Sequence, residues 1–357
     1  MTTQQVNSKS VLTIFLPDLS GGGAERSMVI LANALASRGY EVDLVLAIRR
    51  GVYFEELSKE VNLVCLGEKK FVSSLIPLMR YMKQRQPYAI FAALDIANLA
   101  VILMKLVTRS KSKLIATQRV LASEAYRSVY RNCSCIRYLI MPWLISIFYP
   151  FADRVVAVSK DVQRDLIECF HLLPEKVVTI YNPLPVEWVY NQARQEVGHP
   201  WFQEKRYPIV IGVGRLVAQK NFGTLIRAFA LVLQELDSRL VILGEGEERE
   251  ELEKLAHQLN ISDKVDLPGF DPNPFKYMKR ADVFVLSSLF EGLPGVLLQA
   301  MALETPVVAT DCPGGVREIL EDGKWGAIVP LDDLPALAKA ILKGLRGELP
   351  DPTPRAS

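Results

Sequence analysis

A glutamate, a glycine-rich turn and an amide follow one another in residues 291–300, EGLPGVLLQA. Gly295 and Gln299 are four positions apart and would share one face of a helix. Pro294 suits the first turn of that helix, where its missing N–H costs nothing, and Glu291 stands just before it. This arrangement leaves room for a ligand rich in hydroxyl groups. A surface carboxylate and a solvated amide fit the same spacing.

Two cations lie in residues 214–222, GRLVAQKNF, just before another predicted helix. Arg215 and Lys220 beside a helix N-terminus suit a diphosphate, because both the side chains and the free N–H groups attract its negative charge. Gly214 ends the preceding predicted strand. An exposed basic loop fits the spacing equally well.

Residues 19–26, LSGGGAER, form a glycine-rich turn between the first predicted strand and the first predicted helix. Gly22 and Gly23 would let the backbone approach a phosphate or a polar sugar closely. A flexible turn is the alternative. Arg26 stands where the dinucleotide fingerprint requires a third glycine, which disfavours a dinucleotide-dependent oxidoreductase.

The elements that must position these loops are strands and helices in alternation. Strands are predicted at 11–16, 42–48, 62–66, 89–94, 113–117, 154–159, 177–182, 209–214, 239–244, 265–269, 282–288 and 306–310. Helices are predicted at 24–39, about 222–236, 247–259 and around 333–345. We therefore expect an α/β protein with two doubly wound, Rossmann-like domains facing a central cleft, in which the loops after the strands share one sheet edge. Residues 1–183 and 209–357 would form the domains, and the Pro- and Gly-punctuated residues 184–208 a linker.

Composition excludes several classes of function. The 357 residues carry a net charge of only +2, which argues against a nucleic-acid partner. Five scattered cysteines and three histidines form no zinc pattern, and no Asp-x-Asp follows a predicted strand to hold Mg²⁺. We expect neither a metal nor a cofactor, so arginine, lysine and helix dipoles would have to neutralise any phosphate.

One stretch suggests a membrane surface. Eight basic residues and one acid lie in the segment from Lys105 to Arg137, with Tyr126 and Tyr130 among them and Tyr138 directly after. The apolar run at 138–152 follows, at 15 residues too short for the ~20 that a membrane-spanning helix needs. The pattern fits contact with anionic lipid, and a solvated helix face over a core is the alternative. Because the N-terminus is polar and lacks an apolar signal core, a cytoplasmic location, peripheral on the inner face of the membrane, is expected.

In combination, these motifs identify a resemblance. The order GGGAE, VAVS, KVVTIYNP, GRLVAQKNF, ADVFVLSSLFEGLP, TPVVATDCPGG and GAIVP resembles the retaining glycosyltransferases of family 4, which have the two-domain GT-B fold. The resemblance covers nearly the whole chain and implies a nucleotide-diphospho-sugar donor.

The resemblance also implies roles for individual residues. Arg215 and Lys220 would hold the diphosphate, and Glu291 would bind hydroxyls of the donor sugar. Nearby donor-binding backbone would come from Gly22, Gly23, Gly214, Gly292, Leu293, Pro294, Gly295 and Val296. Gln299 replaces the family's second acid, which would hold the ribose, and its amide carbonyl can still accept a hydroxyl.

Three further positions depart from the family pattern. Glu304 stands where glycine is common, and Gln118 and Arg119 stand where some relatives carry a histidine. Arg119 is a candidate contact to phosphate or acceptor. Relatives usually continue through further helices after the one predicted around 333–345, so a truncated C-terminus is expected.

The implied reaction moves a sugar from the donor to a hydroxyl of a glycan or lipid-linked acceptor without a metal and with retention of anomeric configuration. Arg215 and Lys220 would stabilise the leaving diphosphate most in the transition state. Because no residue stands out as a covalent nucleophile, a front-face route fits. A GT-B nucleotide-sugar epimerase and a non-catalytic nucleotide-sugar binder are the alternatives.

Overall fold

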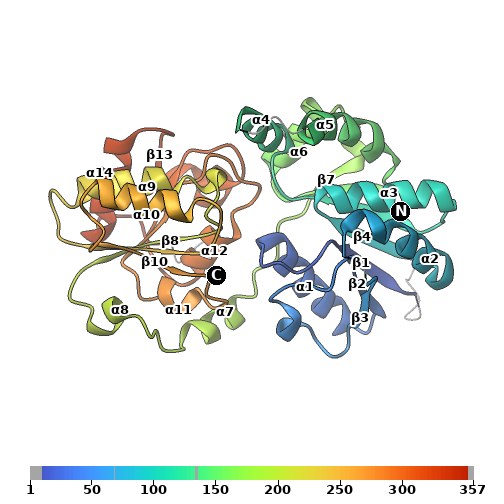
Figure 1. Cartoon of the computed structure of the whole chain (residues 1–357), viewed down its shortest axis with the longest axis horizontal. Helices are drawn as coiled ribbons and strands as arrows, with labels where there is room; N and C mark the ends of the chain where they lie inside the picture. Colours follow the sequence, from blue (N-terminus) through green and yellow to red (C-terminus); the bar gives the residue numbers. More distant parts are fainter. Residues whose placement is uncertain (1–9, 68, 133–135, 353–357) are drawn as a thin grey trace. The chain divides into compact units, whose positions relative to one another are not determined.

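The computed structural model describes residues 10–67, 69–132 and 136–352 (Figure 1). The chain divides into two compact units, Met1–Pro183 and Leu184–Ser357. A parallel sheet forms the centre of each unit. This confirms the predicted α/β class and the two doubly wound sheets.

Unit 1 contains a seven-stranded sheet in the order β3-β2-β1-β4-β5-β6-β7. All neighbouring strands are parallel. The strands are β1 (Leu12–Leu16), β2 (Val42–Leu46), β3 (Asn62–Cys65), β4 (Ala89–Ala93), β5 (Lys113–Gln118), β6 (Arg154–Ala157) and β7 (Val177–Thr179). Each corresponds to a predicted strand, because buried parallel strands are continuous apolar runs that are easy to recognise.

Six α-helices lie between the strands of unit 1 in the described residues, and β2 and β3 are joined by a segment with only a short 3₁₀ turn. The helices are α1 (Gly23–Ala36), α2 (Leu75–Arg85), α3 (Asp95–Thr108), α4 (Ala122–Asn132), α5 (Ile136–Phe148) and α6 (Lys160–Glu168). Short 3₁₀ turns lie at Phe54–Glu56, Phe71–Ser74, Tyr149–Phe151 and Pro174–Lys176. Side chains of α1 and of the first three strands form one core, which includes Ile14, Val29 and Leu44.

Unit 2 contains a six-stranded parallel sheet in the order β10-β9-β8-β11-β12-β13. The strands are β8 (Ile209–Val213), β9 (Arg239–Leu243), β10 (Val265–Gly269), β11 (Val283–Leu286), β12 (Val307–Thr310) and β13 (Ala327–Val329). The helices between and after them are α9 (Phe222–Val232), α10 (Arg249–Gln258), α11 (Phe275–Met278), α12 (Gly295–Ala302), α13 (Val316–Leu320) and α14 (Leu334–Leu345). Figure 1 shows α9, α10 and α14 on one face of this sheet and α11 and α12 on the other. 3₁₀ turns lie at Ala218–Lys220 and Glu321–Gly323.

The segment 184–208, expected as a linker, contains two helices, α7 (Val186–Ala193) and α8 (Pro200–Glu204). Both belong to unit 2 and pack against its other elements. Trp188 meets the Phe275 ring edge-on at a centroid distance of 5.4 Å, and His199 Nε2 lies 2.7 Å from Asp266 Oδ2. Two of the prolines that suggested a linker therefore start short helices, because Pro185 is the N-cap of α7 and Pro200 is the first residue of α8.

In both sheets the strand order reverses beside the first strand of the unit. In unit 1 this switch lies between β1 and β4, and in unit 2 between β8 and β11. Open parallel sheets bind ligands at the carboxyl ends of the strands at such switch points. The loops after β8 and β11 are the ones that carry Arg215, Lys220 and Glu291.

A buried carboxylate lies on the second strand from the edge of the unit 1 sheet. Asp43 in β2 has a fully buried side chain. It accepts hydrogen bonds from Tyr81 (2.6 Å), Asn62 (3.0 Å) and Arg85 Nε (2.9 Å). Burial alone would raise the pKa of Asp43, but the hydrogen bonds from Arg85, Tyr81 and Asn62 outweigh it and the pKa is lowered.

Replacing Asp43 with asparagine is therefore expected to lower the free energy of unfolding at pH 7 by roughly 2–4 kcal/mol, because Arg85 loses its buried partner. The lowered pKa of Asp43 means that its contribution is present above the unfolded-state value near 4 and is lost as pH falls through the folded-state value. Denaturant unfolding of both proteins across the acid range would show this. Equal acid dependence in D43N and the unaltered chain would contradict it.

Candidate active site

The loop after β8 is fixed by close approach of the loop after β9. Gly244 has a φ of +149°, and a Cβ there would lie 1.8 Å from the Gly214 carbonyl oxygen. Backbone bonds from Gly214 N–H to Leu243 O (3.0 Å) and from Leu216 N–H to Glu245 O (2.9 Å) join the two loops. Only glycine permits this packing, which holds the backbone between Gly214 and Lys220 in one conformation.

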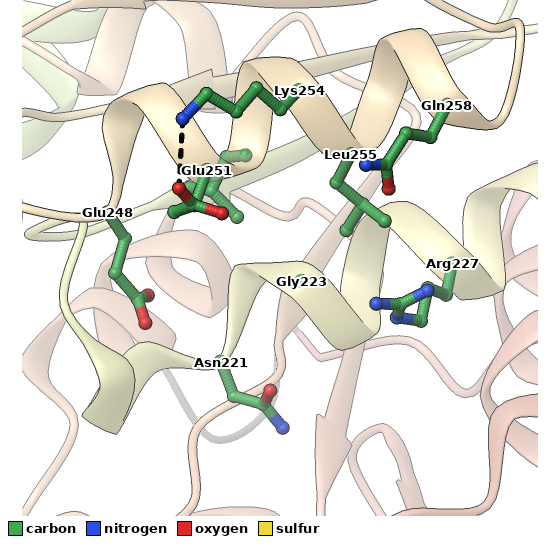
Figure 2. Close-up of a pocket in the computed structure, with 9 residues that line it drawn as sticks. Asn221, Gly223, Arg227, Glu248, Glu251, Lys254, Leu255 and Gln258 are labelled. Carbon is green, nitrogen blue, oxygen red and sulfur yellow. Dashed lines mark hydrogen bonds and ion pairs between the residues drawn. The ribbon is translucent and has the colours of Figure 1, made fainter. Parts of the chain in front are cut away.

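Lys220 and Glu291 form an ion pair across the switch point of unit 2. Lys220 Nζ lies 2.5 Å from Glu291 Oε1, and the side chains are only 16% and 8% exposed. Ser288 Oγ donates to the same Oε1 at 2.6 Å. The Oε2 atom accepts no hydrogen bond from the part of the chain that the structure describes, so it is available to a ligand hydroxyl. Figure 2 shows a contrasting pair in the same unit, Lys254 and Glu251 on α10, which is exposed and 3.1 Å apart.

The two loops that carry this pair are bound directly to each other. Gln219 Nε2 donates to Phe290 O at 2.9 Å, and Leu289 N–H donates to Gln219 O at 2.8 Å. Ser287 Oγ donates to the Lys220 carbonyl at 2.8 Å. Because hydrogen bonds join the two loops, the backbone helps to set the distance between the Lys220 ammonium and the Glu291 carboxylate.

Beyond Glu291 the chain turns into α12. Gly292, Leu293 and Pro294 are buried, whereas Gly295 and Val296 are half-buried. Pro294 occupies the N-cap and the helix begins at Gly295, so the proline lies one residue earlier than predicted. Its φ of −69° fits either place.

The N-terminus of α12 has space and donors for a ligand. A Cβ at Gly295 would meet no atom within 4 Å. The N–H groups of Gly295 and Val296 donate to no acceptor in the described residues. Such groups at a helix N-terminus attract negatively charged oxygen atoms. A Cβ at Gly315 would lie 2.7 Å from Leu293 Cδ1, so the glycine turn after β12 supports this segment from behind.

Arg215 and Gln299 are placed beside these groups in the sequence but make fewer contacts. The Arg215 side chain is exposed, and Gln299 on the second turn of α12 is half-buried. Neither side chain forms a hydrogen bond or ion pair within the described ranges. The structure thus brings Lys220 and Glu291 into contact, whereas the side chains of Arg215 and Gln299 form no hydrogen bond with other described residues. Glu304, the other departure from the family pattern, bonds Lys279 and Tyr190 at the far end of α12.

The candidate residues of unit 1 lie at the carboxyl edge of its own sheet. Gly22 is the N-cap of α1 and Gly23 its first residue. Arg119 directly follows β5 and donates from Nη1 to Asn182 Oδ1.

Sequence reasoning missed the residues that hold the central pair. Ser288 contacts Glu291 directly, whereas Gln219 and Ser287 fix the loops. The available signal was two serines immediately after a buried strand, a place where polar side chains meet at a sheet edge. Nothing in the local sequence could have indicated that Gln219 bonds a backbone carbonyl 71 residues away.

A cavity of about 220 Å³ lies between the first half of α9 and the length of α10. Asn221, Arg227, Glu248 and Gln258 are among the residues that line it, as Figure 2 shows. Neither Lys220 nor Glu291 lines it. The chemistry of the ion pair, rather than this cavity, therefore marks the candidate site.

Two observations bear on metals and thiols. Within the described residues, no group of three or more His, Cys, Asp or Glu side chains is arranged to hold a metal ion. Two of the five cysteines for which the sequence predicts no zinc site, Cys133 and Cys135, lie outside the described residues. Cys312, in the loop after β12, has its pKa raised to about 12 by burial and by the charge of Glu291, with Lys220 acting in the opposite direction.

The chain matches two known protein families and is similar in sequence to proteins of known name. Residues 21–188 match the family described as Glycosyltransferase Family 4, and residues 195–355 match Glycosyl transferases group 1. A Campylobacter jejuni protein named N-acetylgalactosamine-N,N'-diacetylbacillosaminyl-diphospho-undecaprenol 4-alpha-N-acetylgalactosaminyltransferase is 32% identical over 95% of this chain and 90% of its own length. A second protein from that organism, an alpha-1,4-N-acetyl-D-galactosaminyltransferase named for a diNAcBac-PP-undecaprenol substrate, is 28% identical over 92% of this chain and 87% of its own.

Solved structures share the fold. Anabaena HepE in complex with UDP and glucose has a TM-score of 0.78 at 20% identity and covers 97% of this chain and 93% of its own. Sucrose-phosphate synthase from Thermosynechococcus elongatus has a TM-score of 0.77 at 19% identity, with 98% and 93% coverage. Together with the family matches, these likenesses confirm the GT-B fold. The chain belongs to glycosyltransferase family 4 and is a glycosyltransferase that uses a nucleotide-sugar donor.

Proposed function

We propose that this glycosyltransferase moves a sugar from a uridine-diphosphate donor to a hydroxyl of a lipid-linked glycan, with retention of configuration and without a metal ion. The observation that carries the proposal is the Lys220–Glu291 pair at the switch point of unit 2, beside the open N-terminus of α12. The pair provides a cation for phosphate and a carboxylate for sugar hydroxyls, and the two groups are in direct contact.

In the proposed reaction the bond between the sugar's anomeric carbon and the diphosphate oxygen breaks, and its electron pair stays on that oxygen. The acceptor hydroxyl oxygen forms the new bond on the same face of the sugar. Its proton passes to the departing phosphate oxygen, so no protein nucleophile is required. Lys220, Arg215 and the N–H groups of Gly295 and Val296 would stabilise the charge that develops on the diphosphate.

Glu291 would orient the sugar through its Oε2 atom while Ser288 holds Oε1. Gln299 would accept from a ribose hydroxyl through its amide carbonyl, and Gly214 packs against the stem of Lys220, with a Cβ position 3.4 Å from Lys220 Cε. These roles follow the family pattern and the open donors and acceptors of the site. Gly22 and Gly23 would approach the donor through backbone N–H groups at the start of α1.

The names of the relatives support the acceptor class. Two Campylobacter jejuni proteins are named as galactosaminyltransferases for undecaprenol-diphosphate-linked sugars, and each matches almost the whole of this chain. We infer an acceptor of the same chemical type, a glycan joined to a polyprenol through a diphosphate.

The test combines donor and acceptor screens on the purified chain. UDP-sugars are supplied with a polyprenyl-diphosphate-linked disaccharide and EDTA, and released UDP and the mass of the lipid are measured. Addition of a sugar to the lipid in the presence of EDTA supports metal-independent transfer to the proposed acceptor. NMR of the product that shows the same anomeric configuration as the donor sugar supports retention. Isomerised nucleotide sugar without acceptor would indicate the epimerase alternative, and binding without turnover the non-catalytic one.

We also propose that unit 1 rests on an anionic lipid surface, on the cytoplasmic face that the sequence predicts. Among the described residues no helix is both long and apolar enough to cross a membrane. Helix α5 presents Ile140, Trp143 and Ile147 to solvent, with Trp143 72% exposed. Their spacing puts them on one face of the helix.

Helix α3, which contacts α5, also exposes apolar side chains. Leu103, Leu106 and Val107 on α3 are exposed, and the cations Arg109 and Lys111 follow that helix. Apolar side chains flanked by cations are typical of helices that lie in a lipid interface. The structure does not describe the side chains of residues 128–139, which include part of the basic and aromatic stretch.

Trp143→Ser combined with Ile147→Ser is expected to reduce co-sedimentation with phosphatidylglycerol vesicles at least tenfold, because two buried-in-lipid side chains contribute roughly 3 kcal/mol or more. Val52→Ser, an exposed apolar position elsewhere in unit 1, serves as the control. Vesicle binding by the double variant equal to that of the control would refute the lipid contact.

A further inference from the structure

The guanidinium of Arg119 has one edge occupied and one edge open. Nη1 donates to Asn182 Oδ1. Nε is buried and has no hydrogen-bond partner, and Nη2 forms no hydrogen bond with the described residues either. Nε and Nη2 make up the side-on edge that binds two oxygen atoms of one carboxylate or phosphate.

The positive charge of Arg119 also lacks a carboxylate in direct contact. Burial lowers the pKa of Arg119 to about 10, and the charge of Glu25 opposes that shift. Arg119 remains protonated at neutral pH, but its contacting partner is the neutral amide of Asn182. A buried charge without a contacting counterion is costly, so an anion that binds the guanidinium would offset that cost.

Arg119 also lies where a ligand is expected in a parallel sheet. It directly follows β5, Asn182 lies shortly after β7, and Glu25 is in the first turn of α1. All three therefore belong to segments at the carboxyl edge of the unit 1 sheet.

A rigid network supports the backbone around Arg119. Gln118 Nε2 donates to Val120 O at 3.1 Å, and the buried Tyr149 hydroxyl lies 3.1 Å from Gln118 Oε1. Tyr149 in turn receives a 2.8 Å hydrogen bond from Asn98. The residues on both sides of Arg119 are thus fixed, whereas the Nε–Nη2 edge itself is left unpaired, which is the arrangement of a preorganised binding group.

We propose that Arg119 binds a phosphate group of a substrate through its Nε–Nη2 edge, while Asn182 holds the guanidinium in position. The inference rests on the proposed function, in which both the nucleotide donor and the lipid-linked acceptor contain a diphosphate. Either diphosphate could accept two hydrogen bonds from the guanidinium, and the experiment below distinguishes the donor from the acceptor.

A purely structural arginine would behave differently when it is replaced. Arg119→Gln removes an incompletely matched buried charge, so the melting temperature of the ligand-free chain should stay within about 2 °C of the unaltered value or rise. A structural role predicts a clear fall. Arg119→Lys keeps the charge but cannot present two donors side by side.

The experiment titrates the intact chain with UDP and, separately, with farnesyl diphosphate. Arg119→Gln is expected to weaken binding of at least one probe roughly tenfold to hundredfold, and Arg119→Lys to weaken the same probe. A loss confined to UDP assigns Arg119 to the donor, and a loss confined to farnesyl diphosphate assigns it to the acceptor. Arg38→Gln, an exposed position in the same unit, is the control and should bind like the unaltered chain.

Affinities of both probes within threefold of the unaltered chain would overturn the inference. If Arg119→Gln does not fold, near-normal binding by Arg119→Lys overturns it as well. Sugar transfer by the unaltered chain is measured in parallel. Transfer together with normal probe binding by the variants rejects the Arg119 role alone, whereas no transfer by the unaltered chain rejects the proposed function.

Discussion

Replacement of Lys220 with alanine is expected to lower kcat at saturating donor by a factor of about 10² to 10³. The Nζ atom belongs to the mostly buried lysine of the candidate site and lies 2.5 Å from Glu291 Oε1. Removing one preorganised charge from the place where a leaving group becomes negative costs about 3–4 kcal/mol of transition-state stabilisation. Steady-state kinetics with UDP release as the signal would measure the effect, and Lys220→Arg should retain part of the activity.

The exposed pair on α10 provides a matched control for this variant. Lys254 also contacts a glutamate, Glu251, at 3.1 Å, but the two side chains are 60% and 75% exposed. Lys254→Ala removes the same functional group from the same unit and should leave kcat within a factor of two. Transfer by Lys220→Ala at the rate of Lys254→Ala would remove Lys220 from the reaction.

The architecture could be predicted from the sequence because buried parallel strands are continuous apolar runs. Strands such as VLTIFL and IVIGVG are recognisable without any knowledge of their partners. The short helices of residues 184–208 were not recognised, since α8 has only five residues and the prolines that start such helices also mark loops. What holds these helices is contact with β10 and α11, to which His199 and Trp188 bind.

The local part of the candidate site is visible in the sequence where a single segment carries both a functional residue type and a helix start. The segment from Glu291 to Val296 contains an acid, a turn and a helix N-terminus in succession. Its spacing left a ligand-binding turn and a surface carboxylate as alternatives, and the family resemblance favoured the first. The contact between Lys220 and Glu291 spans 71 residues, and family resemblance rather than spacing paired them. Asp43 shows the same limit, because Tyr81 and Arg85, which make its charge tolerable, lie 38 and 42 residues away.

The network around Arg119 was out of reach for a related reason. Sequence position suggested a contact to phosphate or acceptor, but the unpaired Nε and the bond to Asn182, 63 residues away, are tertiary facts. A charged residue after a strand is common, whereas a buried charge that lacks a contacting counterion is informative.

Glu291→Gln is expected to separate the binding of the sugar from the binding of the diphosphate. The carboxylate has Oε1 engaged by Lys220 and Ser288, and its Oε2 is available to a sugar hydroxyl. An amide is a poorer partner for that hydroxyl, so kcat/KM for the UDP-sugar should fall roughly tenfold to hundredfold. Affinity for UDP alone should stay the same or increase, because Lys220 is then released from its ion pair and can serve the phosphate. Kinetics and calorimetric titration with UDP measure the two effects independently.

The free energy of unfolding provides a second measurement for Glu291→Gln. With Glu291 neutralised, the mostly buried Lys220 loses its counterion, and the free energy of unfolding should fall by about 1–3 kcal/mol. The double variant Lys220→Met with Glu291→Gln should recover most of that loss and remain inactive, because it removes both charges together. Glu251→Gln on the exposed α10 pair should change neither stability nor turnover by a measurable amount. If Glu291→Gln instead weakened UDP binding and left sugar transfer intact, Glu291 would have to be assigned to the nucleotide rather than to the sugar.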